Sequence, residues 1–247
     1  MAVPPRAARI ADAAEDAATA FARELASIWR QTERRLIGWL QEATSTGRPT
    51  AVLRATQGIQ AREAMRRVLR DAGYDTLVLE ATDAPLTRLS EAVLVREASV
   101  LGAAFPSRIE ALKALQTLDL LEEGDHIARQ LWKALVRGLL GGESAREIMA
   151  DLLPLLDLTE AQVATLYDTS VSIFGRQVEA LQAGQDPATP FLYAGPDDPL
   201  TREFCIKRVG HVYTRQEIDD MDNGQLNNVF LTGGGYNCRH VWLEVVS

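Results

Sequence analysis

The feature that most constrains the fold is an apolar periodicity of three and four residues, which continues through most of the first 184 positions. This spacing places apolar side chains on one face of an α-helix, because 3.6 residues complete a turn. The pattern predicts one long helix that ends in the turn-forming run at 44–49. Its apolar stripe, interrupted only by Thr32, consists of Ile10, Ala14, Ala17, Phe21, Leu25, Ile28, Leu36 and Trp39.

Turn and capping residues divide the rest of this region into further helices. Glycine favours helix C-termini, proline favours the first turn, and Ser or Thr followed three residues later by Glu or Gln favours the N-cap. We therefore expect a mainly α, multi-helix region. Later helices are predicted at about 50–72, before Gly73, at about 83–104, and from Pro106 onward. Gly141-Gly142 closes the helix that carries Leu131, Leu135 and Leu139, and His126 lies near a helix start. The last helices begin at a capping box of Ser144 and Glu147 and at a second cap of Thr159 and Gln162, the latter running toward Gln182.

The composition changes after residue 184. Prolines and glycines become frequent, and short apolar runs such as Val229-Phe230-Leu231 and Val241-Trp242-Leu243 replace the long stripes. Such runs between turn residues are typical of strands, here around one short helix near 214–222. We predict two domains, a helical region over 1–184 and a compact α+β module over 185–247.

Composition excludes several classes of protein. Hydrophobic residues make up 47% of the chain and charged residues 24%, which is the balance of an ordinary globular protein rather than a disordered or collagen-like one. The net charge of -8 excludes a uniformly cationic DNA coat. No apolar run is long enough for a membrane span, and the first residues lack the apolar core of a signal peptide. We expect a chain that is made and used in a cytoplasm.

Charge is unevenly distributed along the helical region. Residues 1–70 carry 12 basic and 7 acidic side chains, whereas residues 71–184 carry 9 basic and 18 acidic ones. Two explanations stay open: the helices neutralise each other within the fold, or the basic half forms a face for an acidic partner or for DNA. The arginines that would form such a face are Arg30, Arg34, Arg35, Arg62, Arg66, Arg67 and Arg70.

Both cysteines and two of the three histidines lie within 36 residues of each other, as Cys205, His211, Cys238 and His240. Thiolate and neutral imidazole are preferred zinc ligands, and four of them close a tetrahedral structural site without an open position. A small module with few large aliphatic residues is also a kind of domain that a metal stabilises. The spacing matches no common zinc-finger pattern, so an ordinary buried cluster and a Cys205–Cys238 disulfide remain alternatives.

Two other patterns in the tail favour structural interpretations. The run Gly233-Gly234-Gly235 lacks the Lys-Ser/Thr of a phosphate-binding loop, and it indicates positive φ angles or a close backbone crossing before Cys238. Asp219, Asp220 and Asp222 precede a turn signal and indicate a solvated helix end. The sequence contains neither Gly-x-Ser-x-Gly nor His-Glu-x-x-His. We therefore predict no active site, and a protein that is not an enzyme.

The tail nevertheless contains a recognisable arrangement of motifs. An Asp-x-x-Thr-Arg element is followed by Cys205, and the chain then reaches a Gly-Gly-Gly-Tyr-Asn-Cys-Arg-His element. Together they resemble the end of the tailed-phage minor head proteins of the Mu F-like head-morphogenesis family, in which a long helical region also precedes the module. The matched positions are Asp198, Thr201, Arg202, Cys205, Cys238, Arg239 and His240.

This resemblance implies a structural protein of the virion that is present in a few copies per particle. It would associate with the portal and/or the major capsid protein at the head vertex, and it would be present in the host cytoplasm during assembly. By their charge alone, the arginine-rich helices are candidates to contact packaged DNA or an acidic face of the portal. Arg202 and Arg239 are expected to pin turns of the tail through carboxylates such as Asp197 or Asp198.

Two other functions remain as alternatives. A metal-dependent hydrolase or nuclease would need an open metal position and a general base, for which Asp219, Asp220 or Asp222 are candidates. A DNA-associated protein delivered with the genome would use the arginine-rich helices, and its binding would weaken steeply with salt.

Overall fold

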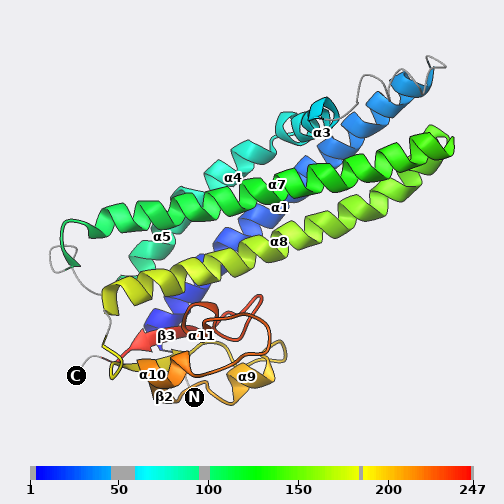
Figure 1. The fold of residues 1–247 in the computed structure, drawn as a ribbon. Helices are drawn as coiled ribbons and strands as arrows, with labels where there is room; N and C mark the ends of the chain where they lie inside the picture. Colours follow the sequence, from blue (N-terminus) through cyan, green and yellow to red (C-terminus); the bar gives the residue numbers. More distant parts are fainter. Residues whose placement is uncertain (1–3, 46–58, 95–100, 184–185, 246–247) are drawn as a thin grey trace. The chain divides into compact units, whose positions relative to one another are not determined.

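The computed structural model describes residues 4–45, 59–94, 101–183 and 186–245, and long helices dominate it up to residue 183 (Figure 1). The mainly α prediction for this region is confirmed, as is the α+β character of the tail. Parts of two predicted helices, at 50–58 and 95–100, lie outside the described residues. The helices are α1 (Pro5–Ser45), α3 (Ile59–Asp71), α4 (Tyr74–Thr82), α5 (Ala84–Val93), α7 (Phe105–Gly141) and α8 (Ala145–Ala183).

Several predicted helix boundaries are confirmed. The helix α1 covers the whole predicted stripe. Gly73 follows α3 with a φ of 106°, a left-handed conformation that glycine adopts at little cost. Ser144 and Glu147 form the predicted capping box, in which the Ser144 amide and hydroxyl donate to the Glu147 carboxylate and Ser144 Oγ accepts from the Glu147 amide.

Two boundaries were predicted wrongly. The helix expected over about 83–104 ends at Val93, and Leu94 is extended. The Val93 carbonyl accepts hydrogen bonds from the side chains of Arg6 and Gln182, which satisfy it at the helix end. Thr159 begins no helix, because α8 runs through it: its hydroxyl donates to the Leu156 carbonyl within the helix.

The chain forms two compact units, each assembled from separate stretches. One unit comprises Ala20–Glu80 and Thr117–Ala164. The other comprises Met1–Thr19, Ala81–Gln116 and Thr165–Ser247. The predicted boundary near residue 185 coincides with the change from α8 to strands; that it separates two domains stays a prediction.

The first of these units has a helical core with a few polar anchors. Trp29 Nε1 donates to the Leu156 carbonyl (2.7 Å), and the Tyr74 hydroxyl donates to the Leu120 carbonyl (2.7 Å). Arg66 is paired internally with Asp75 and Asp125, both at 2.7 Å. The buried side chains include Phe21, Leu25, Trp29, Leu36, Tyr74, Leu120, Ile127, Leu131 and Leu135.

In the second unit, buried polar side chains of the C-terminal half of α8 form hydrogen bonds with other segments. Glu179 is 3% exposed, and its carboxylate accepts from Arg6 and from the backbone amide of Glu244. Gln182 donates to Glu179 and to the Val93 carbonyl. These bonds connect the start of α1, the end of α5 and the last strand to one face of α8.

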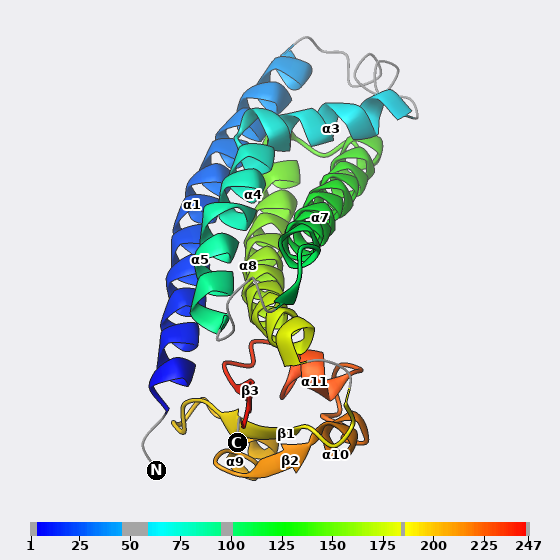
Figure 2. The same cartoon turned by 90° about the vertical axis from the view of Figure 1, so that its left-hand side faces the viewer.

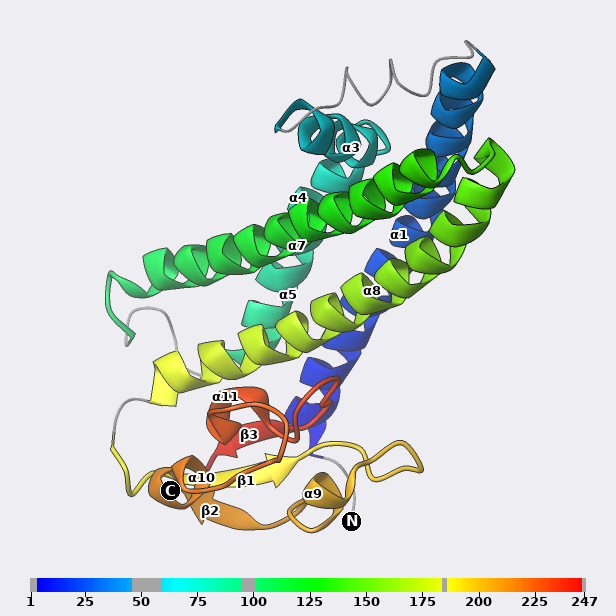
Figure 3. The same cartoon turned by 45° about the vertical axis from the view of Figure 1, so that its right-hand side comes forward.

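The tail forms a three-stranded antiparallel sheet in the order β2-β1-β3, with short helices around it (Figure 2). The helices α9 and α10 lie at opposite ends of the β1–β2 pair (Figure 3). Aromatic residues dominate its core, namely Phe191, Tyr193, Phe230 and Trp242. The elements are β1 (Pro190–Ala194), α9 (Glu203–Ile206), β2 (Val212–Thr214), α10 (Arg215–Asp219), α11 (Val229–Thr232) and β3 (Val241–Glu244).

The predictions for individual tail elements had mixed outcomes. The run Val241-Trp242-Leu243 is a strand as predicted, and the short helix near 214–222 is α10, capped by Thr214 and Glu217. The run Val229-Phe230-Leu231 is helical rather than extended, because Asn228 in the left-handed region caps α11 through its side chain. Among the described residues, no helix combines the length and the apolar character that a membrane crossing requires.

Candidate metal centre

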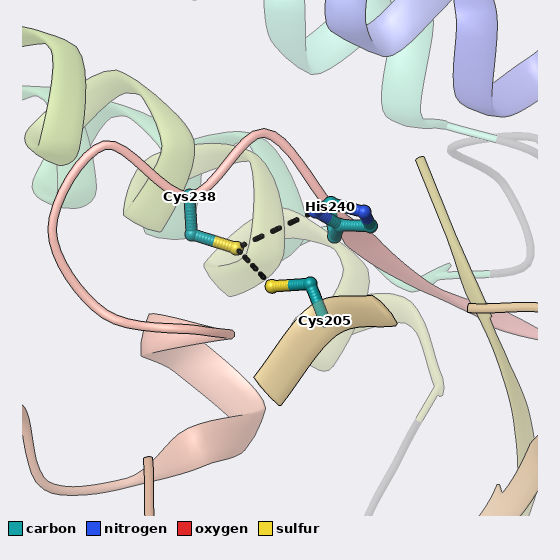
Figure 4. Close-up of side chains that lie close together, drawn as sticks. All are labelled: Cys205, Cys238 and His240. Atoms are coloured by element: carbon teal, nitrogen blue, oxygen red, sulfur yellow. Dashed lines mark hydrogen bonds between the residues drawn. The ribbon is translucent and has the colours of Figure 1, made fainter. Parts of the chain in front are cut away.

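Three of the four predicted metal ligands lie together in the tail. Cys205 is on α9, whereas Cys238 and His240 belong to the segment that leads into β3, and their side chains converge (Figure 4). All three side chains are buried. Their ligand atoms all lie within 4.8 Å of one another, so the group could hold a metal ion.

The distances within this group fit a tetrahedral metal site. The two sulfur atoms are 3.9 Å apart, and Cys238 Sγ is 3.9 Å from His240 Nδ1. Zinc–sulfur bonds of about 2.3 Å at tetrahedral angles place two sulfurs about 3.8 Å apart. Both cysteines are free thiols here, which does not support the disulfide alternative.

The sulfur atoms also receive hydrogen bonds from neighbouring groups. The Gly234 amide donates to Cys238 Sγ (3.1 Å), and the Tyr193 hydroxyl lies 3.3 Å from Cys205 Sγ and 3.4 Å from Cys238 Sγ. Burial raises the pKa of Tyr193 well above its ordinary value, so this phenol is a neutral donor. Such donors stabilise thiolates, which are the form of cysteine that binds metals.

The two thiols differ in acidity. The hydrogen bond from Cys205 lowers the pKa of Cys238 well below its ordinary value, and the nearby charge of Arg176 acts in the same direction. The hydrogen bond to Cys238 and burial raise the pKa of Cys205. A metal ion bound by both sulfurs would displace the protons of the thiols, because thiolate is the form of cysteine that binds metals.

The glycine run lets the backbone approach the sulfur atoms. A Cβ atom on Gly234 would lie 2.4 Å from Cys205 Sγ, which no side chain can tolerate without movement. Gly233 has a φ of 58°. Both features expected of Gly233-Gly234-Gly235, a positive φ and a close crossing before Cys238, are confirmed.

Arg176 on α8 holds the segment that carries two of the ligands. Its side chain is buried and donates to the carbonyls of Cys238 (2.6 Å), His240 (2.7 Å) and Leu231 (3.2 Å). Sequence reasoning missed this residue. The available signal was an arginine placed between Phe174 and Val178, two residues of the face that packs inward.

The remaining residues of the predicted motif also contact one another. Arg239 pairs with Asp198 at 2.7 Å, as expected, and the Thr201 hydroxyl lies 3.2 Å from the same carboxylate. In the part of the chain that the structure describes, Arg202 contacts no carboxylate; it donates to the Gly234 carbonyl and to Gln225 Oε1. Its expected role of pinning a turn is therefore performed through a backbone carbonyl.

The structure does not bring every candidate residue to the cluster. His211 is exposed and lies outside the group of three, where its carbonyl accepts from the Tyr193 amide. Asp219, Asp220 and Asp222 are exposed as well, and Asp219 pairs with Arg215. Within the described residues, none of these aspartates belongs to a group that could hold a metal.

A pocket of about 330 Å³ adjoins the cluster. Cys205, Cys238 and His240 form part of its wall, and the charged side chains of Asp168, Arg202 and Arg239 form another part. Burial raises the pKa of Asp168, although the charges of Arg239 and Arg176 oppose that effect.

Comparison with known proteins gives no relative: no protein-family model, no curated protein and no solved structure matches this chain.

Proposed function

We propose that this chain is a structural minor head protein of a tailed phage, which associates with the portal or capsid vertex during head assembly. The observation that carries the proposal is the mutual contact of the motif residues. Asp198 contacts both Thr201 and Arg239. Arg202 holds the glycine run next to the group formed by Cys205, Cys238 and His240. An ion pair between residues 41 positions apart in the sequence supports a structural role for the motif.

The same proposal assigns structural zinc to the tail. Two cysteines and a histidine at these distances suit zinc, and the module has a small core of its own. Zinc would join α9 to the segment before β3. Metal analysis of protein purified under reducing conditions without chelators tests this part, and the expected content is one zinc per chain.

The helical region is proposed to dock on the portal or coat. Arg30, Arg34 and Arg35 are exposed on α1 and are therefore available to an acidic protein face or to packaged DNA. Arg66, by contrast, is engaged in internal ion pairs. Arg66 therefore does not contribute to a basic surface, whereas Arg67 and Arg70 on α3 are exposed and can extend it.

The experiment is affinity purification of the tagged chain from infected cells, with nuclease treatment, followed by mass spectrometry. Portal and coat subunits are expected to dominate the recovered proteins. A recovery of host proteins or nucleic acid without capsid proteins would reject the proposal, and retention of DNA alone would favour the genome-associated alternative.

A matched pair of variants locates the docking surface. Reversal of Arg30, Arg34 and Arg35 to glutamate is expected to reduce portal recovery, since these side chains are exposed. The control reverses three exposed cations on α7, namely Arg129, Lys133 and Arg137, and is expected to leave recovery unchanged. Equal loss in both variants would show that overall charge, and not the α1 surface, determines binding.

A further inference from the structure

We propose that a metal ion held by Cys205, Cys238 and His240 keeps its fourth coordination position open to the adjoining pocket, where it binds a small exchangeable anion. This inference rests on the metal site of the proposed function. It goes beyond it, because a structural zinc with four protein ligands has no exchangeable ligand.

Cys205, Cys238 and His240 supply one ligand fewer than zinc usually takes. Zinc takes four ligands in most protein sites, and three protein ligands with an open position characterise sites that bind water or another small ligand. The described residues supply three ligand atoms within 4.8 Å of one another. His211, the fourth residue expected from the sequence, is exposed elsewhere in the module.

The pocket lies directly beside the candidate metal site. All three ligand residues line it, so an ion bound between them borders the pocket. Tyr193, the other polar group next to the sulfurs, is fully buried in the aromatic core and is not among the residues lining the pocket. It therefore hydrogen-bonds the sulfurs from the core side and leaves the pocket side to an external ligand.

A third, independent observation is a buried polar atom that lacks a partner. His240 is 2% exposed, and its Nε2 atom has no hydrogen-bond partner among the described residues. Its Nδ1 atom faces Cys238. Buried polar atoms are nearly always satisfied, which points to a water or small ligand beside Nε2, on the side of the ring away from the sulfur of Cys238.

The charges of the pocket wall indicate the class of ligand. Two guanidinium groups, of Arg202 and Arg239, and one carboxylate, of Asp168, line the wall. A zinc ion with two thiolates and a neutral imidazole has no net charge, and Arg239 is paired with Asp198. The wall therefore favours an anion through the hydrogen-bond donors of its two guanidinium groups rather than through an excess of charge. A monoanion such as hydroxide, azide or a small carboxylate matches this environment.

Cobalt substitution tests the inference on the full chain. Co²⁺ bound to two thiolates has intense visible absorption that responds to a change of ligand, so titration with azide should give a saturable spectral shift. Imidazole, a neutral ligand of similar reach, serves as the comparison. An unchanged spectrum at azide concentrations that leave cobalt bound would overturn the inference.

The variant Asp168→Asn tests the role of the pocket wall. It removes a negative charge without changing the size of the side chain, so azide should bind several-fold more tightly while imidazole affinity stays the same. Equal changes for both ligands would show that the variant alters the shape of the pocket, and no change for either would place the exchangeable position elsewhere.

Two further variants show whether a protein side chain, rather than an external anion, occupies the fourth position of the metal. Tyr193→Phe and His211→Ala should both bind one cobalt with the parent spectrum. A spectrum that becomes azide-sensitive only in one of them would identify that residue as the fourth ligand and reject the open position, while the metal site would stand. Absence of stoichiometric cobalt in the parent chain would reject the metal site itself and this inference with it, but would leave the portal association untouched.

Discussion

The helical unit formed by residues 20–80 and 117–164 and the C-terminal module obtain their order from different interactions. The helical unit buries aliphatic side chains along long stripes, and its polar anchors are few. The module buries aromatic rings, two thiols and a histidine, and one arginine binds its backbone. Burial of apolar area tolerates many substitutions, whereas directional bonds to buried groups tolerate few. The module should therefore be far more sensitive to single changes than the helices.

The largest effect should come from removal of the metal. A ligand at a thousand times its Kd stabilises the folded state by about 4 kcal/mol, so chelation should unfold the module. We expect loss of the near-ultraviolet circular dichroism of Tyr193 and Trp242, with the helical far-ultraviolet signal largely retained. His240→Ala should abolish zinc binding, whereas His211→Ala should keep it. A near-ultraviolet spectrum unaffected by chelator would show that the module, like the helical unit, does not need a metal to stay folded.

The next largest effect should come from Arg176→Met. This change leaves the carbonyls of Leu231, Cys238 and His240 without their donor, at a cost of about 3 kcal/mol. Denaturant unfolding followed by tryptophan fluorescence measures the loss. Arg176→Lys should restore only part of it, since one ammonium cannot reproduce the forked contacts. The control Arg129→Met, on the exposed face of α7, should change stability by less than about 0.5 kcal/mol.

Two glycine substitutions compare the regions directly. In Gly234→Ala the new methyl group would lie 2.4 Å from Cys205 Sγ, so the glycine run must move and the metal affinity should fall. We expect a destabilisation of about 2 kcal/mol. In Gly38→Ala the methyl group meets nothing within 4 Å, and alanine should stabilise α1 by up to about 1 kcal/mol. Thermal unfolding of both variants measures the difference, and shifts in the same direction would contradict it.

The long helices were predictable because their signal is periodic and local. The stripe of α1 and the capping box at Ser144 and Glu147 each depend on residues within a few positions of one another. Thr159 was misinterpreted for the opposite reason: its hydroxyl is satisfied within α8, and it accepts from Trp29, a residue 130 positions away. A capping pattern in the sequence cannot show such a distant partner.

The candidate site was predictable in its residue types and not in its geometry. Cys205, Cys238 and His240 follow from the chemistry of zinc ligands. His211 belongs to the same set by type, but the β1–β2 pairing turns it toward solvent. Arg176 escaped notice because its partners are carbonyl groups, which every residue has and no motif records.

The smallest effect concerns an exposed contact of the motif. The hydrogen bond from Arg239 lowers the pKa of Asp198 to about 2, below its value of about 3.9 in an unfolded chain. A lowered folded-state pKa means that this carboxylate stabilises the fold fully above pH 3.9 or so and loses its contribution as the pH falls through about 2. Asp198→Asn should therefore flatten the acid side of the stability profile of the metal-free chain.

Asp197→Asn provides the matched control, because it removes the same charge one position away, on a side chain exposed to solvent. Stability measured by denaturant titration at several pH values between 2 and 5 should decline in parallel for this control and the parent chain, and less steeply for Asp198→Asn. Parallel profiles for all three chains would mean that the Asp198–Arg239 pair adds nothing to the module. The acid sensitivity of the module would then come from its buried groups alone. Metal removal, Arg176→Met and Gly234→Ala act on buried groups of the module as well, in contrast to the aliphatic core of the helical unit.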